Sequence, residues 1–303
     1  MRKTLKRLGE PALSFLLANS EAISRRRGRV LILAYHNIVP SDSHPTGDVS
    51  MHLPFEEFVR QLDLLERHCD VVPLMSLCEK GGTASTRPRV VITFDDAYVG
   101  AVTWALPELA RRRMPSTVFV SPGFLDHKSF WWDHLANPIT GVLAPGIRQT
   151  ALEKLSGKHE DVMKWASENK LTISEVPAFA RGSAVVDLYR ASELFGVSFA
   201  PHTWSHPNLS RISRGELEHE IHAPLAWLNE HFGGRVVPAL AHPYGLFGEE
   251  TELVARDAGI RLTLRVEGGW CESEFSTDLP LPRLNVASGL STAGFRLRLA
   301  GIL

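Results

Sequence analysis

The chain has 303 residues, 44% of them hydrophobic, and can therefore bury a large core as one α/β domain or as two smaller ones. Its formal net charge of −1 excludes a strongly basic surface, so we expect no nucleic acid as a partner. Three cysteines without metal-binding spacing, Cys69, Cys78 and Cys271, argue against a disulfide scaffold and against a cysteine zinc site. We expect them to be buried free thiols.

Residues 1–29 form a basic, amphipathic segment ahead of the first strand. The basic start and the short apolar run at 11–18 together resemble a signal peptide. Glu10 and Pro11, however, interrupt the segment between them, and no clear cleavage site follows. No apolar run reaches the ~18 residues that a membrane span needs. We expect a cytoplasmic protein whose N-terminal helix packs on the domain, with peripheral membrane contact through this segment as the alternative.

Strands and helices alternate along the first part of the chain. Apolar runs rich in β-branched residues predict strands at 30–35, 71–74, 89–94 and 117–120. Apolar residues at helical spacing predict helices over 55–65 and 104–113. Such alternation is typical of parallel βαβ units.

Residues 128–193 have a different pattern. Charged, helical sequence dominates there, and no apolar strand is present among these residues. We expect a helical insertion between two barrel units. The alternation then resumes, with strands predicted at 197–200, 236–240, 260–266 and 281–286 and with helices opened by the Ser213-x-x-Glu216 capping box and ended by Gly259. Residues 291–303 are a C-terminal tail.

Two carboxylates, Asp95 and Asp96, directly follow the strand at 89–94, and His202 and His206 follow the strand at 197–200. One carboxylate and two imidazoles suit a divalent transition metal such as zinc and leave positions for water and substrate. The second carboxylate is then free to act as a base. An aspartate pair alone is more often a helix cap, and lone histidines are more often surface residues, but their joint placement favours a metal site. Parallel barrels carry their sites at such strand ends, where His36 and Tyr244 also lie.

These motifs resemble the signatures of the polysaccharide deacetylases with NodB homology, carbohydrate esterase family four. Thr93-Phe94-Asp95-Asp96 resembles the first motif, and His202-x-x-x-His206-Pro207 resembles the second. Leu33-Ala34-Tyr35-His36 and Leu240-Ala241-His242-Pro243-Tyr244-Gly245 resemble two further parts of the family pattern, and the resemblance spans roughly residues 30 to 286. It implies a distorted (β/α)7 barrel, a NodB-like catalytic domain over residues 30–290 that carries the helical insertion.

The resemblance also implies a function and the residues that perform it. Asp96, His202 and His206 would hold a divalent metal, with Zn²⁺ as the first candidate, and Asp95 would deprotonate a water molecule. A backbone amide near Tyr244 would help to hold the oxyanion. Pro243 and Gly245 would also build a structural turn at this position, and both roles are compatible. The implied reaction removes the N-acetyl group from an acetamido sugar in a glycan or a glycan precursor, so the expected partner is a carbohydrate.

Three positions depart from the family pattern. Ala97 stands where glycine is usual, and Ala241 stands where the third motif commonly has an arginine that orients the base. Arg283 is our candidate to supply that guanidinium. No histidine follows His242, so the late Leu-x-His motif, whose histidine protonates the leaving amine, is absent.

The missing acid leaves alternatives open. His36 is the first candidate to donate the proton, followed by His242 and His127, although His36 is equally suited to hydrogen-bond neighbouring loops. Two alternative functions also stay open for the whole chain. It could be a glycan-binding protein that has kept the fold and the metal but has lost turnover, or a hydrolase of another small amide or formamide. Candidate substrate-binding residues are Trp131, Trp132, Trp204 and His242, and aromatic pairs such as the first two are more often core residues.

Overall fold

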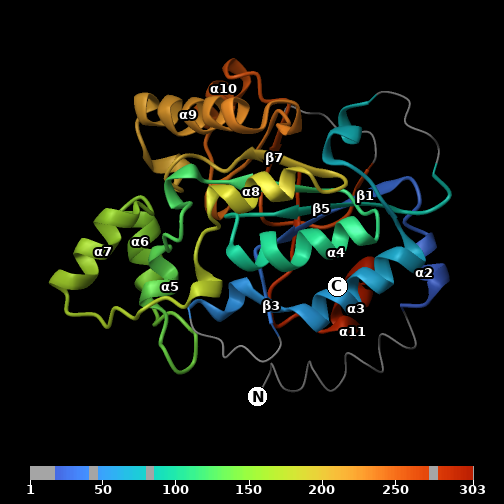
Figure 1. Cartoon of the computed structure of the whole chain (residues 1–303), viewed down its shortest axis with the longest axis horizontal. Helices are drawn as coiled ribbons and strands as arrows, with labels where there is room; N and C mark the ends of the chain where they lie inside the picture. Colours follow the sequence, from blue (N-terminus) through green and yellow to red (C-terminus); the bar gives the residue numbers. More distant parts are fainter. Residues whose placement is uncertain (1–17, 41–46, 80–84, 273–278, 303) are drawn as a thin grey trace.

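The computed structural model describes residues 18–40, 47–79, 85–272 and 279–302. Parallel strands form the centre of the molecule, and helices surround them (Figure 1). In ring order these strands are β1 (Arg29–Tyr35), β5 (Arg89–Phe94), β6 (Ser116–Val120), β7 (Val197–Pro201), β8 (Ala239–Ala241), β9 (Leu262–Leu264) and β11 (Leu284–Asn285).

The ring of strands closes on itself. Neighbours from β1 to β7 pair in parallel through continuous ladders, and β8 pairs with β9 in the same way. Single bridges complete the circuit, from Phe199 to Val236 ahead of β8 and from Leu264 to Leu281 ahead of β11, which returns to β1. The distorted seven-stranded barrel expected from the sequence is therefore present, and its distortion lies in these two thinly bonded junctions.

The described residues contain four further strands, all of them short. The strand β4 (Asp70–Val71), expected from the sequence, pairs with the beginning of β5. Patterning did not predict the other three, because each has only two or three residues: β2 (Asn37–Val39), β3 (His52–Pro54) and the antiparallel β10 (Cys271–Glu272).

Helices cover the barrel between its strands. They are α3 (Phe55–His68), α4 (Leu106–Arg111), α8 (Val185–Ser192), α9 (Arg214–Phe232) and α10 (Glu249–Asp257). The predicted capping box opens α9, since Ser213 and Glu216 bond reciprocally, and the helix continues through Pro224. The side-by-side arrangement of α9 and α10 places their apolar sides over β8 (Figure 1).

The helical insertion is present but ends earlier than expected, since α8, within the predicted range 128–193, covers the barrel beside β7 instead. Helices α5 (Trp131–Leu135), α6 (Ile147–Lys154) and α7 (His159–Glu168) gather at one side of the barrel, on the left in Figure 1. They share a small core with the loops of the barrel, in which Phe130, Trp131 and Trp132 are buried. The insertion therefore packs as a second layer against the carboxyl ends of the strands.

The two ends of the described chain meet. Helix α11 (Thr292–Leu299), in the segment predicted as a tail, buries Phe295 and packs against α3. Near the start, α2 (Ser20–Ser24) buries Ile23, and the Arg26 guanidinium donates to the carbonyl of Ala300 at 3.0 Å. Residues 1–17, which carry the predicted membrane contact, lie outside the described residues.

The described residues bear on two further expectations, which concern membrane spans and the cysteines. No helix among them is long and apolar enough to cross a membrane. All three cysteines are free thiols, with Cys69 buried and Cys78 and Cys271 partly exposed. Burial raises the pKa of the Cys69 thiol to about 12, so it is protonated and unreactive at neutral pH.

Candidate active site

A cavity of about 400 Å³ opens at the carboxyl ends of the barrel strands. The rim of the barrel and the insertion both contribute to its walls, so it lies between the two layers of the molecule. Its lining includes His36, Asp95, Asp96, Trp132, Arg148, His202, His206, Tyr244 and Asn285.

Three of these residues form a compact group of metal-binding type. Asp96, His202 and His206 are buried, and one ligand atom from each lies within 4.8 Å of the others. Asp96 Oδ1 is 3.3 Å from His206 Nε2 and 3.6 Å from His202 Nε2. Metal–ligand bonds of about 2.0–2.1 Å in a tetrahedron place neighbouring ligand atoms about 3.3 Å apart. The spacing therefore fits a zinc-sized ion.

The hydrogen bonds of this group point to the same use. His202 Nδ1 lies 2.8 Å from the carbonyl oxygen of Ala241. A donated proton on Nδ1 leaves the lone pair of Nε2 for a cation, as in many metal-bound histidines. Asp96 Oδ1 is buried and has no hydrogen-bond partner among the described residues. A bound cation would satisfy this otherwise costly oxygen.

Burial controls the charges of these three residues. It lowers the pKa of His202 and holds that of His206 well below its ordinary value, so both imidazoles are neutral, as ligands must be. Burial raises the pKa of Asp96, and the negative charges of Asp95 and Asp133 raise it further. Two neutral imidazoles and a carboxyl group that resists ionisation without a counter-charge suit a divalent cation.

Asp95 has the opposite surroundings from its neighbour. The Arg283 guanidinium donates two hydrogen bonds to its carboxylate, from Nη1 to Oδ1 and from Nη2 to Oδ2, each of 2.7 Å. Burial, the largest single influence, favours the neutral acid, but the charge and hydrogen bonds of Arg283 together with the nearby His202 and His36 outweigh it, so the pKa of Asp95 is lowered. Arg283 is completely buried, and its Nη1 also donates to Thr93 Oγ1 at 3.2 Å. Asp95 is thus ionised and held in one orientation.

The loops that present these groups have an uncommon backbone. Among the described residues, Asp96, Ala97, Thr203, His206 and Tyr244 all have positive φ angles, between 49° and 69°. Residues other than glycine adopt this region at a cost, and such residues cluster at functional sites. The sharp turns let two successive carboxylates point in different directions.

The sequence matches the family model described as polysaccharide deacetylase over residues 82–263. This match covers more than half of the chain. The chain belongs to the polysaccharide deacetylase family. It is therefore a hydrolase of the deacetylating type.

Solved structures of other deacetylases share the fold. A deacetylase of Streptococcus pyogenes, solved in complex with acetate, is 17% identical with a TM-score of 0.60, covering 89% of this chain and 98% of that one. A polysaccharide deacetylase of Bacillus cereus is 15% identical with a TM-score of 0.60, covering 89% and 69%. IcaB from Ammonifex degensii is 17% identical with a TM-score of 0.59, covering 89% and 97%. No curated protein sequence matches the chain significantly.

The structure gathers most of the predicted site residues of this deacetylase at one cavity. His36 lines it, with Nε2 4.0 Å from Asp95 Oδ2. Trp132 and Tyr244 form an aromatic wall around His206, with ring centroids 5.0 and 4.6 Å from the imidazole. Tyr244 also accepts a hydrogen bond from Trp131 Nε1 at 2.9 Å, which fixes its ring.

Five other candidates do not line this cavity, of which Arg283 lies behind Asp95, to which it is bonded. Trp131 is buried behind Tyr244, and His127 is exposed on the loop after β6. His242 is buried beside α10, with Nε2 2.8 Å from Glu252 Oε1. Trp204 faces a different cavity, of about 670 Å³, although it stands between His202 and His206 in the sequence. The loop turns between those two ligands, so the residue in the middle points away from them.

The sequence pattern did not indicate several residues of the cavity wall. Arg148 and Leu152 lie one helical turn apart on α6 of the insertion, and Arg148 donates to Asp48 Oδ2 at 2.8 Å. The other unpredicted residues of the wall are Ser50, Met51, Leu246, Val266 and Asn285. Asn285 follows Arg283 by two positions, so strand alternation could have placed both on one face. No local signal identifies the residues of α6, because their place depends on how the insertion packs.

Proposed function

We propose that this deacetylase removes the N-acetyl group from an acetamido sugar with the help of a divalent ion, zinc being the first candidate, held by Asp96, His202 and His206. The observation that carries the proposal is the close approach of Asp96 Oδ1 to Nε2 of both buried imidazoles, at 3.3 and 3.6 Å, beside the ionised Asp95. A divalent ion in this place would act as a Lewis acid on the acetyl carbonyl and would make a water molecule easier to deprotonate. The two carboxylates therefore have separate roles.

Asp95 is the general base. It is ionised, it lines the cavity, and it lies beside the metal ligands, with Oδ2 4.0 Å from His202 Nε2. Arg283 fixes its orientation from behind, which is the task of the arginine that the third motif lacks at Ala241. A base held in one orientation reaches the water with little loss of entropy.

His36 passes the proton to the leaving amine. Of the three histidines considered for this role, it alone is on the cavity wall in the described structure. Burial lowers its pKa to about 4, so the resting imidazole is neutral. It receives the proton during turnover, through Asp95, and a histidine with so low a pKa gives it up readily.

The cavity supports a single sugar ring as the reacting unit. Its volume of about 400 Å³ is near the lower end of the range for small-molecule sites. Trp132 and Leu152 offer apolar surface for a ring face, while Arg148 and Asn285 offer donors for hydroxyl groups. Tyr244 lies at the turn where a backbone amide can face the developing oxyanion.

Two alternative functions follow from the absent late histidine. A glycan-binding protein would bind the sugar without releasing acetate. A hydrolase of another small amide would release a different acid, such as formate from a formamide.

Incubation with a panel of N-acetylated sugars and oligosaccharides, with and without added Zn²⁺, separates these functions. The proposal predicts acetate release that a chelator abolishes and added metal restores. Binding measured by calorimetry without any acetate release would support the glycan-binding protein. Formate from formylated substrates, with N-acetyl sugars untouched, would support the amide hydrolase.

A further inference from the structure

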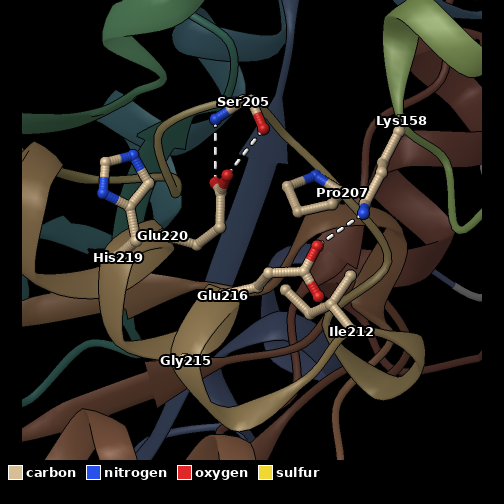
Figure 2. Close-up of a pocket in the computed structure, with 8 residues that line it drawn as sticks. All are labelled: Lys158, Ser205, Pro207, Ile212, Gly215, Glu216, His219 and Glu220. Atoms are coloured by element: carbon tan, nitrogen blue, oxygen red, sulfur yellow. Dashed lines mark hydrogen bonds and ion pairs between the residues drawn. The ribbon is translucent and has the colours of Figure 1, made fainter.

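The loop between the two histidine ligands is bonded to a carboxylate on a neighbouring helix. Glu220, in α9, is buried, and its Oε2 accepts hydrogen bonds from the backbone amides of Trp204 and Ser205, both at 2.8 Å. Its Oε1 accepts a third from Ser205 Oγ at 2.6 Å. Figure 2 shows Glu220 pointing from α9 toward Ser205. One side chain thus bonds two of the three residues between His202 and His206.

This loop needs external support. Thr203 and His206 have positive φ angles of 67° and 57°, which side-chain-bearing residues adopt at a cost. Within the loop, Thr203 Oγ1 accepts from the amide of His206 at 3.0 Å. The loop must nevertheless aim two Nε2 atoms at one point, and a small change in its backbone would separate them.

The other side of the loop contacts the segment after β6. Ser121 Oγ donates to the carbonyl of His202 at 2.8 Å, and the amide of Gly123 donates to the carbonyl of Trp204 at 2.9 Å. A Cβ atom at Gly123 would lie 2.6 Å from that carbonyl oxygen. The loop is therefore held between this segment and Glu220, and of these contacts only those of Glu220 are assisted by a charge.

The helix that carries Glu220 is itself well fixed. Leu217 and Ile221 are buried on either side of Glu220 in the sequence. At the start of α9, Glu216 pairs with Lys158 of the insertion at 2.5 Å. A pocket of about 360 Å³ lies between this pair and the bonds from Glu220 to Ser205 (Figure 2). The position of the Glu220 carboxylate is thus set by packing rather than by the loop.

We infer that Glu220 is a positioning residue for metal binding: it holds the loop between His202 and His206 in the conformation that aims both imidazoles at Asp96. This inference rests on the proposed metal site. Glu220 does not line the cavity of the site, and it acts through the backbone of Trp204 and Ser205. Its removal should weaken metal binding rather than the packing of the barrel.

The test measures the metal dissociation constant by competition with a chromophoric chelator, and the melting temperature of the metal-free protein by calorimetry. For Glu220→Ala we expect a dissociation constant about 10- to 100-fold higher, the usual effect of losing a group that orients a metal ligand. Glu220→Gln keeps an acceptor for the two amides and can donate to Ser205 Oγ, so it should restore most of the affinity.

Two matched variants of the same helix serve as controls. Glu218→Ala removes an exposed carboxylate whose one partner among the described residues is Arg214 on its own helix, and both measurements should stay unchanged. Leu228→Ala removes a buried core residue far along α9 and should lower the melting temperature with the metal dissociation constant unchanged. This second control separates positioning from general loss of stability.

Each outcome decides a defined point. Wild-type affinity in Glu220→Ala, or an equal loss of affinity in Leu228→Ala, would overturn the inference while leaving the metal site intact. Absence of metal binding in the wild-type protein would instead refute the proposed function. Should Glu220→Ala not fold, Ser205→Ala removes one of the three bonds and should weaken metal binding measurably. Unchanged affinity in Ser205→Ala would then overturn the inference.

Discussion

The rim of the barrel and the helical insertion border the same cavity but contribute different chemistry to it. The rim supplies ionisable groups in strained loops, each held by a second group: Asp95 by Arg283, and His202 by the carbonyl of Ala241. The insertion supplies Trp132, Leu152 and Arg148 from ordinary helices. Positive φ angles of residues other than glycine also occur elsewhere in the described chain, as at Arg113 and Lys170, but at the rim they lie at or next to the groups that must be aimed.

This difference predicts how variants divide. Groups that act only in the transition state reduce kcat when they are removed, whereas groups that bind substrate and transition state equally raise KM alone. We therefore expect rim variants to lose turnover and insertion variants to lose affinity.

Removal of a metal ligand should have the largest effect. His206→Ala should lose most of its bound metal and all metal-dependent acetate release, because the site then has two protein ligands in place of three. Metal content by plasma emission spectroscopy and acetate release by a coupled assay are the measurements, with circular dichroism to show that the barrel is folded. Stoichiometric metal in this variant would remove His206 from the ligand set.

Removal of the base should reduce turnover without loss of metal. Asp95→Asn keeps the shape of the side chain but cannot take a proton, so kcat should fall by about 10²-fold or more. Metal content should equal that of the wild type, since Asp95 is not among the three ligands. Near-normal kcat would mean that another group deprotonates the water.

His36→Gln should slow turnover by about tenfold or more with unchanged metal content. The pKa of His36 is lowered by burial to about 4, so the imidazole is already neutral between pH 6 and 9. The shape of the kcat profile over that interval should therefore be the same in wild type and variant. A variant that moved the alkaline limb would show that His36 carries its proton at rest.

The same histidine should make stability depend on pH. In the unfolded chain it takes up a proton near pH 6.5, whereas the folded protein takes it up only near pH 4. The unfolded state therefore binds more protons between these values, and the protein loses stability as the pH falls through them. Denaturant unfolding should show a smaller loss over this interval for His36→Gln than for wild type.

The contrast between rim and insertion also explains what the sequence could predict. Asp95, Asp96, His202 and His206 follow apolar strands whose run lengths are plain in the sequence, and parallel strands bring their carboxyl ends to one rim. The barrel and the metal group could therefore be predicted from patterning together with the family motifs. The contact of Arg283 with Asp95 also agrees with the expectation from the missing motif arginine.

The remaining wall residues depend on tertiary packing. Arg148 lies on α6, whose sequence pattern is that of an ordinary charged surface helix. It reaches the cavity because α6 packs against the barrel. Trp204 was expected at the cavity because it lies between His202 and His206 in the sequence, but it lines a different cavity. The turn at Thr203, which has a positive φ angle, points the next side chain away from the two histidines. Glu220 follows no recognisable motif at all, because it acts on a loop from another element.

Loss of Arg148 should affect substrate affinity alone. Arg148→Ala removes a charged donor from the cavity wall, and we expect KM to rise about tenfold with kcat unchanged, the usual scale for one hydrogen bond to a charged group. Lys154→Ala, an exposed position on the same helix, is the matched control and should change neither constant. A fall in kcat for Arg148→Ala would contradict the expectation that insertion residues affect substrate affinity alone.

The smallest effect is expected at Ala97, where glycine is usual in the family pattern. Ala97 has a φ angle of 49°, which costs a residue other than glycine about 1–2 kcal/mol. Its methyl group is buried, and losing it would cost about 0.8 kcal/mol. Glycine would also stabilise the unfolded chain, by about 0.4–1 kcal/mol. These contributions nearly cancel, so Ala97→Gly should change the free energy of unfolding by less than about 1 kcal/mol.

The converse variant is Gly245→Ala, at a φ angle of 72° in the turn beside Tyr244. Its Cβ would lie 3.1 Å from the amide nitrogen of Val266, so strain and close contact add up, and the variant should be clearly less stable than Ala97→Gly. Urea unfolding of the metal-free proteins measures both. Equal destabilisation of the two variants would mean that the buried methyl of Ala97, rather than its backbone, decides which residue this rim position can carry.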